Sequence, residues 1–372
     1  MIIGVPKEIK LQEHRIGLTP DSVKILTDKG HEVLVQNNGG FEAGFTNEDY
    51  EKVGAKILEK AEDIFESAEI IVKVKEPQMN EVKMIRENQI IYTYLHLAAA
   101  KELTEGLVNS MSVCIAYETV TDDKGRLPLL APMSAVAGRM SIQAGAHSLE
   151  KNQNGRGLLL GGAPGVEPAN VVILGGGVVG ENAAIIATGM RGKVYVVDKS
   201  KDRLAELHKM FGDKIISTQS DKTDLNILVS ECDLLIGGVL IPGAEAPKLI
   251  TKEMIKNMKR GSVVVDVAID QGGCVETSRP TTHANPTYLV DEVVHYCVAN
   301  MPGGVPRTST MALNKATLPL LIKLADQGYK KTLQENKNYL AGLNVYKGKI
   351  TCKGVSEALK LDYTPAEKAI SD

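Results

Sequence analysis

The chain has 372 residues, more than a single hydrophobic core usually serves, so we expect two domains. Its 43 basic and 46 acidic residues nearly balance, which leaves no electrostatic case for a nucleic-acid or membrane partner. Aromatic residues make up 4% of the chain and Trp is absent, which argues against a surface for stacking nucleobases.

Short apolar runs alternate with amphipathic segments over residues 1–125. The triplet Thr19-Pro20-Asp21 combines a capping hydroxyl, a first-turn proline and an acid, so it predicts the start of a helix that Gly30 ends. This alternation is typical of βαβ units and a mostly parallel sheet. The runs that predict strands are residues 2–5, 32–35, 56–58, 69–74, 89–95 and 112–116.

A second series of elements follows the sequence PLLAP at residues 128–132, which predicts a connection between domains. Residues 133–151 are expected to form a long helix whose many small side chains permit close packing. After Pro168, further apolar runs predict strands at residues 171–174, 194–197, 233–236, 262–267 and 294–298.

From Pro306 onward the chain is expected to be helical, because residues 308–327 contain no turn signal apart from Pro319. This tail is too short for a domain of its own and should pack back against the first. We therefore predict an α/β fold in which each of two domains has a mostly parallel, doubly wound sheet. Residues 1–128 plus 306–372 would form one domain, and residues 129–305 a second domain inserted into it.

The chain shows no sign of a membrane or oxidising environment. Its N-terminal sequence carries charge too early for a signal peptide, and no 18 consecutive residues are apolar. We therefore expect a cytoplasmic protein. The cysteines are odd in number and form no CxxC pair, so neither disulfides nor a zinc cluster is expected. They are Cys114, Cys232, Cys274, Cys297 and Cys352.

The most informative segment is residues 170–200, where an apolar run leads into the glycine-rich sequence GGGVVG, a helical stretch and a second apolar run. Gly175 would permit the tight turn, Gly177 the approach of a pyrophosphate, and Gly180 close packing of helix on strand. The helix N-terminus would face the phosphates. The alternative is a glycine-rich packing turn in some other α/β protein.

Asp198 ends the second run about 20 residues beyond the glycines, where a carboxylate accepts hydrogen bonds from a ribose hydroxyl. Because it would repel a 2′-phosphate, the sequence favours NAD over NADP. Lys199, Lys201 and Arg203 follow closely and weaken this preference. We expect residues 129–305 to be a Rossmann domain for NAD, and residues 1–128 plus 306–372 to be the substrate domain.

Ligands of open parallel sheets bind beyond the carboxyl ends of the strands, and five side chains follow predicted strands in this way. Each also has an ordinary structural explanation, such as a solvated lysine, a satisfied histidine, a turn aspartate or a weak surface ion pair between Arg15 and Glu13. The five are Arg15, Lys75, His96, Asp270 and Asn300.

These residue types suit oxidation of a small substrate that carries a carboxylate. Arginine binds a carboxylate through two parallel hydrogen bonds, and lysine adds a point charge to an oxygen. Histidine can remove a proton near neutral pH, and an aspartate can handle a proton of water or ammonia. Substrates with a carboxylate beside an oxidisable carbon are therefore expected.

The sequence resembles the alanine dehydrogenase family almost from end to end. The matching stretches include GVPKE, VKVKEP around Lys75, YLHLAA around His96, PLLAPMS, GGAPGVEPA, VAIDQGGC around Asp270, SRPTT and YCVANMPGGVPRTST. The resemblance implies reversible, NAD-dependent oxidation of L-alanine to pyruvate and ammonium. It also implies a homo-oligomer, often a hexamer.

The resemblance further implies a role for each matching residue. Arg15 and Lys75 would bind the substrate, His96 would be the general acid and base, and Asp270 would assist attack of water on iminopyruvate. The residues implied around NAD are Ser134, Val178, Val179, Asp198, Arg203, Ser220, Val239, Leu240, Val267, Ala268, Ile269, Asp270, Arg279, Val298, Ala299, Asn300 and Met301.

Two departures from the family pattern affect these expectations. Arg203 stands where some members have Lys, which keeps the charge but changes the geometry. Lys323 and Gln327 stand where some members place a Glu and a His for a divalent ion, so no metal is expected. Three other interpretations remain: the dinucleotide-binding component of a transhydrogenase, a non-catalytic NAD-binding protein, and a dehydrogenase for a larger amino acid.

Overall fold

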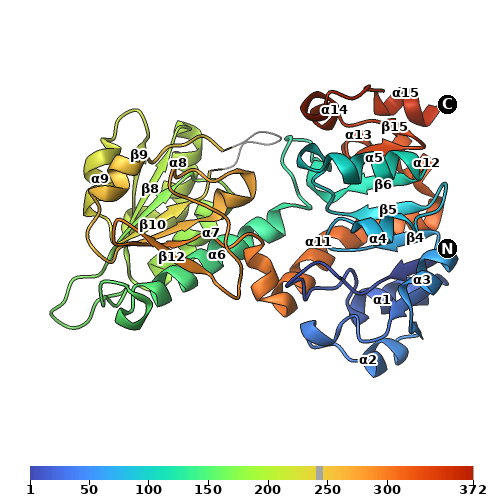
Figure 1. Cartoon of the computed structure of the whole chain (residues 1–372), viewed down its shortest axis with the longest axis horizontal. Helices are drawn as coiled ribbons and strands as arrows, with labels where there is room; N and C mark the ends of the chain where they lie inside the picture. Colours follow the sequence, from blue (N-terminus) through green and yellow to red (C-terminus); the bar gives the residue numbers. More distant parts are fainter. Residues whose placement is uncertain (240–245, 372) are drawn as a thin grey trace. The chain divides into compact units, whose positions relative to one another are not determined.

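The computed structural model describes residues 1–239 and 246–371, which form two compact units. The first unit combines Met1–Met133 with Val305–Asp372, and the second is Ser134–Gly304. Each unit has its own sheet (Figure 1). Within the described residues, no helix is both long and apolar enough to span a bilayer.

The first unit is built on an eight-stranded sheet in the order β15-β14-β6-β5-β4-β1-β2-β3. The six strands from the N-terminal half are all parallel, as the alternating sequence pattern predicts. They are β1 (Ile2–Val5), β2 (Glu32–Gln36), β3 (Lys56–Leu58), β4 (Ile70–Val72), β5 (Ile90–Thr93) and β6 (Val113–Ala116).

Helices cover this sheet closely. Gly4 in β1 shows how closely, because a Cβ there would lie 2.6 Å from Ile64 Cγ2 and 2.7 Å from Ala68 Cβ, in and just after α3. Thr19 caps α1 as predicted, and its side chain accepts a hydrogen bond from the Ser22 N–H. The helices of the N-terminal half are α1 (Pro20–Asp28), α2 (Asn47–Glu51), α3 (Ala61–Ser67), α4 (Met79–Val82) and α5 (Lys101–Asn109), with short 3₁₀ turns η1 (Phe41–Ala43), η2 (Leu97–Ala99) and η3 (Tyr117–Thr119).

The expectation of a helical tail is wrong in part, because the tail also completes the first sheet. Strand β14 (Leu343–Tyr346) pairs antiparallel with β6, and β15 (Lys349–Ile350) pairs antiparallel with β14. Lys347 and Gly348 have positive φ and form the tight turn between them. The tail helices are α11 (Pro306–Gln327), α12 (Tyr329–Gln334), α13 (Lys337–Leu340), α14 (Lys353–Leu359) and α15 (Ala366–Ser371).

Pro319 lies inside α11 without ending it. A proline leaves the carbonyl four residues earlier without its helical partner, which here is that of Lys315. Both residues are exposed, so water can satisfy this carbonyl.

The second unit is a seven-stranded sheet in the order β12-β13-β11-β10-β7-β8-β9. Six strands are parallel and only the edge strand β12 is antiparallel. Numbered in chain order, the parallel strands run 3-2-1-4-5-6, the doubly wound order of dinucleotide-binding folds. The strands are β7 (Asn170–Leu174), β8 (Lys193–Asp198), β9 (Ile215–Gln219), β10 (Leu234–Gly237), β11 (Val263–Asp266), β12 (Thr287–Val290) and β13 (Val293–Tyr296).

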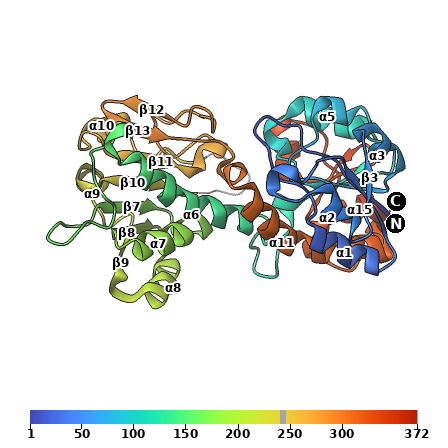
Figure 2. The same cartoon turned by 90° about the horizontal axis from the view of Figure 1, so that it is seen from below.

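Two apolar cores cover the two faces of this sheet. One core includes side chains of α6 and α7, and the other includes side chains of α9 and α10. Figure 2 labels these four helices beside the strands of the sheet. Helix α6 packs closely because of its small residues: a Cβ at Gly138 would lie 2.2 Å from the Val179 carbonyl oxygen. The helices are α6 (Ala131–Ser148), α7 (Val178–Gly189), α8 (Lys201–Phe211), α9 (Leu225–Glu231) and α10 (Lys252–Lys256), with 3₁₀ turns η4 (Lys151–Gln153), η5 (Gly212–Lys214), η6 (Val267–Gln271) and η7 (Met301–Gly304).

The predicted break at residues 128–132 is also wrong at its end, because α6 begins at Ala131 and Pro132 lies in its first turn, where a proline is tolerated. Elsewhere the mixed, mostly parallel sheets confirm the predicted fold class.

Candidate active site

The glycine turn of the second unit has the geometry that a dinucleotide site needs. Gly175 follows β7 with φ of +90°, which a side chain would strain. At Gly180 a Cβ would lie 1.8 Å from the Gly175 carbonyl oxygen, so only glycine lets α7 approach the turn. At Gly177, in contrast, a Cβ would meet nothing within 4 Å. The backbone there is open to a ligand.

Gly177 is also the N-cap of α7, and no side chain caps this helix. The first N–H groups of a twelve-residue helix therefore face outward with the positive end of its dipole. This is the backbone arrangement that binds pyrophosphate. The glycine-rich packing turn that we considered would not require this open, uncapped end.

Asp198, at the end of β8, holds the glycine turn. Its Oδ2 accepts a hydrogen bond of 2.6 Å from the Gly176 N–H, and its Oδ1 accepts one of 2.8 Å from the Ser200 N–H. Arg203 binds the same residue through the next peptide group, because its Nε donates to the Gly176 carbonyl at 2.6 Å. Both residues therefore shape the turn before any ligand binds.

Most of the other residues implied around the cofactor follow the carboxyl ends of the parallel strands. Ser220 follows β9, Val239 follows β10, and Ser134 lies instead on α6. Leu240 lies outside the described residues. Arg279 lies in a loop, with its guanidinium 4.1 Å from the centre of the Tyr288 ring. The sequences that follow β11 and β13 contribute Val267, Ala268, Ile269 and Asp270, and Val298, Ala299, Asn300 and Met301.

Asp270 is exposed within η6, and a second carboxylate, which sequence reasoning missed, supports its turn. Asp266 is fully buried at the end of β11. It accepts hydrogen bonds from the N–H groups of Ala268 and Cys274, at 3.2 Å and 3.0 Å. Its position at the end of an apolar run was the only signal in the sequence.

In the first unit, Arg15, Lys75 and His96 follow three adjacent strands. Arg15 lies in the loop after β1, Lys75 follows β4, and His96 follows β5. The sheet order is β5-β4-β1 and these strands are parallel, so all three residues follow strands that end at the same edge. The sheet order therefore places at one edge the ends of strands whose following residues are up to about 80 residues apart in the sequence.

The ion pair of Arg15 and Glu13 is buried, which corrects the expectation of a weak surface pair. Arg15 is 2% exposed, and its Nε and Nη2 donate to the two oxygens of Glu13 at 2.6 Å and 2.5 Å. Burial lowers the pKa of Arg15, but the hydrogen bonds and charge of Glu13 outweigh it and raise this pKa above its ordinary value. Its Nη1 also lies 3.1 Å from Met133 Sδ.

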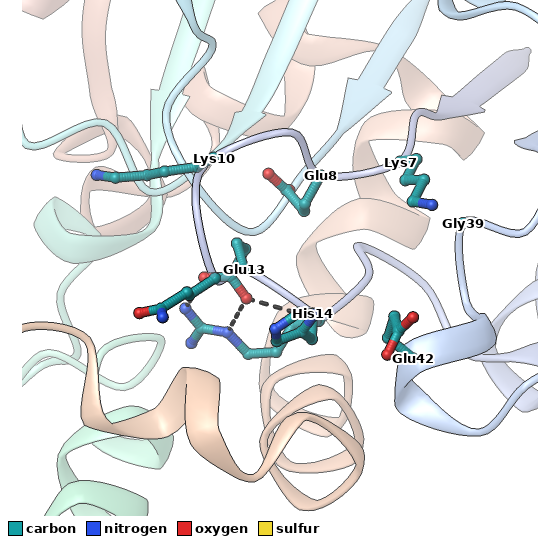
Figure 3. A pocket seen from close by; sticks show the side chains of 9 residues that line it. Lys7, Glu8, Lys10, Glu13, His14, Gly39 and Glu42 are labelled. Atoms are coloured by element: carbon teal, nitrogen blue, oxygen red, sulfur yellow. Dashed lines mark hydrogen bonds and ion pairs between the residues drawn. The ribbon is translucent and has the colours of Figure 1, made fainter. Parts of the chain in front are cut away.

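A cavity of about 230 Å³ adjoins Glu13 and His14 in the first unit (Figure 3). Charged side chains of both signs surround it, which suits a small polar molecule better than an apolar one. It is lined by Lys7, Glu8, Lys10, Gln12, Glu13, His14, Arg15, Gly39 and Glu42.

Glu8, also missed by sequence reasoning, fixes the segment that carries Lys75. One of its oxygens accepts from the Val74 N–H at 2.6 Å and the Lys75 N–H at 3.3 Å. The other accepts from the buried Lys73 ammonium at 2.9 Å, which also lies 3.0 Å from Glu81. These two carboxylates outweigh burial and raise the pKa of Lys73, which is therefore charged at neutral pH.

His96 is not the satisfied structural histidine that its leucine neighbours allowed. It is exposed and has φ of +49°, a left-handed conformation that is rare outside glycine. Its ring stacks on Tyr94 at 5.8 Å between ring centres. The carboxylate of Glu118 accepts hydrogen bonds from the N–H groups of Leu95 at 3.1 Å and His96 at 2.6 Å.

Two further sets of residues discussed from the sequence are the cysteines and the pair that replaces a metal site of some family members. All five cysteines are free thiols, and four of them are buried. Lys323 lies with its ammonium 5.0 Å from the centre of the Tyr339 ring, and Gln327 donates to Thr332 and Glu335. Among the described residues, no group of three or more His, Cys, Asp or Glu side chains could hold a metal ion.

Two segments of this chain match known protein-family domains. Residues 4–137 match the family described as "Alanine dehydrogenase/PNT, N-terminal domain", and residues 141–353 match "Alanine dehydrogenase/PNT, C-terminal domain". The chain belongs to the alanine dehydrogenase/PNT family. The family resemblance noted in the sequence is therefore confirmed.

Individual members of the alanine dehydrogenase/PNT family match the whole chain. It is 55% identical over 370 residues to an alanine dehydrogenase of Halomonas elongata, and 52% identical over 373 residues to one of Methanococcus maripaludis, each alignment covering all of both chains. A solved L-alanine dehydrogenase matches with a TM-score of 0.93 and 49% identity, covering 97% of this chain and 99% of that one. A transhydrogenase from Sinorhizobium meliloti, with 21% identity and a TM-score of 0.82, shares the fold.

Proposed function

We propose that this chain is an NAD-dependent alanine dehydrogenase. The reaction converts L-alanine, NAD and water to pyruvate, ammonium, NADH and a proton, and runs in both directions. The full-length likeness to alanine dehydrogenases carries the proposal. The open glycine turn in one unit and the Arg15, Lys75 and His96 edge in the other support it.

The second unit would bind the cofactor, and its residues fit NAD. The uncapped N-terminus of α7 and the open backbone at Gly177 suit the pyrophosphate. Asp198 would accept hydrogen bonds from the adenosine ribose. When bound, NAD supplies the carbon that accepts the hydride. The sequences after β9, β10, β11 and β13, with Ser134 and Arg279, would complete the site.

The first unit would hold the substrate. Arg15 would bind the carboxylate through its planar guanidinium, which Glu13 keeps charged and fixed. Lys75 would add a positive charge near the substrate oxygens, on a segment that Glu8 holds in place. These two cations would orient the Cα–H bond for transfer of the hydride.

His96 and Asp270 would manage the protons. As the hydride leaves Cα, His96 would accept a proton from the substrate nitrogen, which gives iminopyruvate. Asp270 would then orient the water that attacks the C=N carbon and accept a proton from it. His96 would return its proton to the nitrogen, and as the C–N bond breaks the remaining hydroxyl proton would pass to ammonia. This gives pyruvate, ammonium and, from Asp270, the released proton. The exposure of both side chains suits groups that exchange protons with solvent.

We extend the family resemblance to the organisation of the protein. Residues 1–128 plus 306–372 would be the substrate domain and residues 129–305 the NAD-binding domain. The protein would be a cytoplasmic homo-oligomer, with a hexamer as its form.

The purified protein should form NADH, followed at 340 nm, when given L-alanine and NAD without any second nucleotide. The same assay with NADP should be much slower. A panel of small amino acids would define the substrate, since one methylene changes preference by only about 1–3 kcal/mol. Light scattering on the same sample gives the number of subunits. If NADH formed only when a second, reduced nucleotide such as NADPH was oxidised, the chain would be a transhydrogenase component. Tight NADH binding without turnover would indicate a non-catalytic protein.

A further inference from the structure

Each nitrogen of the Arg203 guanidinium has a partner in the second unit, although the side chain is 25% exposed. Its Nε donates to the Gly176 carbonyl at 2.6 Å, and its Nη1 donates to Glu206 Oε2 at 2.7 Å. Its Nη2 forms an ion pair with Glu181. All three nitrogens of the guanidinium therefore have acceptors, and two of these acceptors are carboxylates.

Packing around Gly176 keeps this arrangement in place. A Cβ at Gly176 would lie 2.9 Å from Leu207 Cδ1, 3.3 Å from Asp198 Oδ2 and 3.5 Å from Arg203 Cγ. The Gly176 N–H donates to Asp198, and the Gly176 carbonyl accepts from Arg203. Arg203 is thus tied to the glycine turn on one side and to two glutamates on the other.

The charges of this cluster are unequal. Asp198, Glu181 and Glu206 carry three negative charges around the single positive charge of Arg203. The cluster lies at the carboxyl end of β8, where the adenosine ribose of a dinucleotide would bind. A 2′-phosphate would meet this excess of negative charge, and the arginine that could bind it already has two carboxylate partners.

We propose that Glu181 and Glu206 are specificity-determining residues that set the preference for NAD over NADP together with Asp198. By pairing with Arg203 they keep its guanidinium from a 2′-phosphate, as a site can exclude a competitor by charge as well as bind the correct ligand. Replacing Asp198 alone would then remove its repulsion of the 2′-phosphate, but it would leave no cation available to bind that phosphate. This inference rests on the dinucleotide site of the proposed function.

The test compares NADP with NAD in four proteins: wild type, Asp198→Ala, Glu181→Gln/Glu206→Gln, and the triple variant. The measurements are kcat/KM for alanine oxidation with each nucleotide, and Kd for NADH and NADPH from fluorescence. The NADP:NAD ratio should be about tenfold or more higher in the triple variant than in Asp198→Ala. In the double variant the ratio should rise far less, because Asp198 still repels the phosphate.

Two further variants identify the cause. Adding Arg203→Gln to the triple variant should abolish the increase in its NADP:NAD ratio, because the released Arg203 guanidinium is the group proposed to bind the 2′-phosphate. Glu253→Gln removes one carboxylate charge from the exposed first turn of α10, as each of the two glutamate substitutions does in the cluster. When added to Asp198→Ala, it should leave the NADP:NAD ratio of that variant unchanged.

A triple variant whose ratio stays within about twofold of Asp198→Ala would overturn the inference. A gain that survives Arg203→Gln would overturn it as well. Either result leaves the proposed function intact if wild type oxidises alanine with NAD. A wild-type protein that neither binds NADH nor oxidises alanine would overturn both.

Discussion

His96 occupies a backbone conformation that costs a side chain about 1–3 kcal/mol, and the neighbouring Glu118 explains how it is maintained. The Glu118 carboxylate accepts from two consecutive N–H groups, those of Leu95 and His96. Hydrogen bonds to a charged acceptor contribute about 1.5–3 kcal/mol each, which is enough to offset this strain. The imidazole is therefore placed by a residue on a different strand end.

Replacing Glu118 with Ala should lower kcat by about tenfold, because the His96 turn loses the acceptor that holds it. His96→Ala should lower turnover by about 10²-fold or more while NADH binding stays near normal. Glu118→Gln keeps one acceptor oxygen and should fall between wild type and Glu118→Ala. The measurements are kcat, KM for alanine and Kd for NADH. An unchanged kcat in Glu118→Ala would show that His96 needs no such support.

For single residues, the sequence indicates which side chains could take part in the reaction, but it does not indicate which neighbours hold them in position. Lys75 and His96 can be selected because each follows an apolar run, and the structure places both at one sheet edge. Glu118 lies 22 residues from His96, and Glu8 lies 67 residues from Lys75. Such partners depend on tertiary packing, which no local pattern encodes.

Helix α7 contains two glycines, one in a tightly packed position and one in an open position. At Gly180 a Cβ would lie 1.8 Å from the Gly175 carbonyl oxygen, whereas at Gly189 it would meet nothing within 4 Å. The first glycine is needed for the turn to close on the helix. The second costs the helix about 0.5–1 kcal/mol relative to alanine, with no contact in return.

Gly180→Ala should therefore lower the free energy of unfolding by about 1–3 kcal/mol and weaken NADH binding, because the glycine turn must move. Gly189→Ala, the matched control in the same helix, should leave binding unchanged and raise stability by up to about 1 kcal/mol. Urea denaturation and NADH titration of both variants make the comparison. Equal effects of the two substitutions would contradict the role given to Gly180.

Elements with strong apolar runs are predictable, whereas three of the four edge strands of the two described sheets are not, β3 being the exception. All eleven predicted strands exist, with ends shifted by a few residues at most. The missed strands are β9, β12, β14 and β15, which lie at or next to sheet edges. A strand in such a position is less fully covered by the core and needs fewer apolar side chains. In β9, for example, only Ile215 is buried, so the segment reads as a polar loop.

On the scale of the whole molecule, the first unit depends on both ends of the chain. Besides the pairing of β14 with β6, α11 binds the loop that carries Arg15. Asn314 on α11 accepts from the Thr19 N–H at 2.8 Å and donates to the Gly17 carbonyl at 3.0 Å. Asn314 is 2% exposed, so no water can replace these contacts.

A chain that ends at Gly304 should consequently lose alanine oxidation and the cooperative unfolding of the first unit, while the second unit keeps NADH binding. Urea denaturation, NADH fluorescence and the 340 nm assay measure these three properties. The full-length variant Asn314→Ala should show a milder defect, with about 1–3 kcal/mol of stability lost. Normal alanine oxidation by the shortened chain would contradict this dependence on the tail.

The pairing of β6 with β14 has a consequence for the growing polypeptide on the ribosome. Residues up to Gly304 emerge first, so the second sheet can form while the β6 edge of the first still waits for its partner. At about 5–20 residues per second, this wait is on the order of tens of seconds. During that time the unpaired edge of β6 can pair with strands of other chains, and this edge is where cellular chaperones would bind the nascent chain.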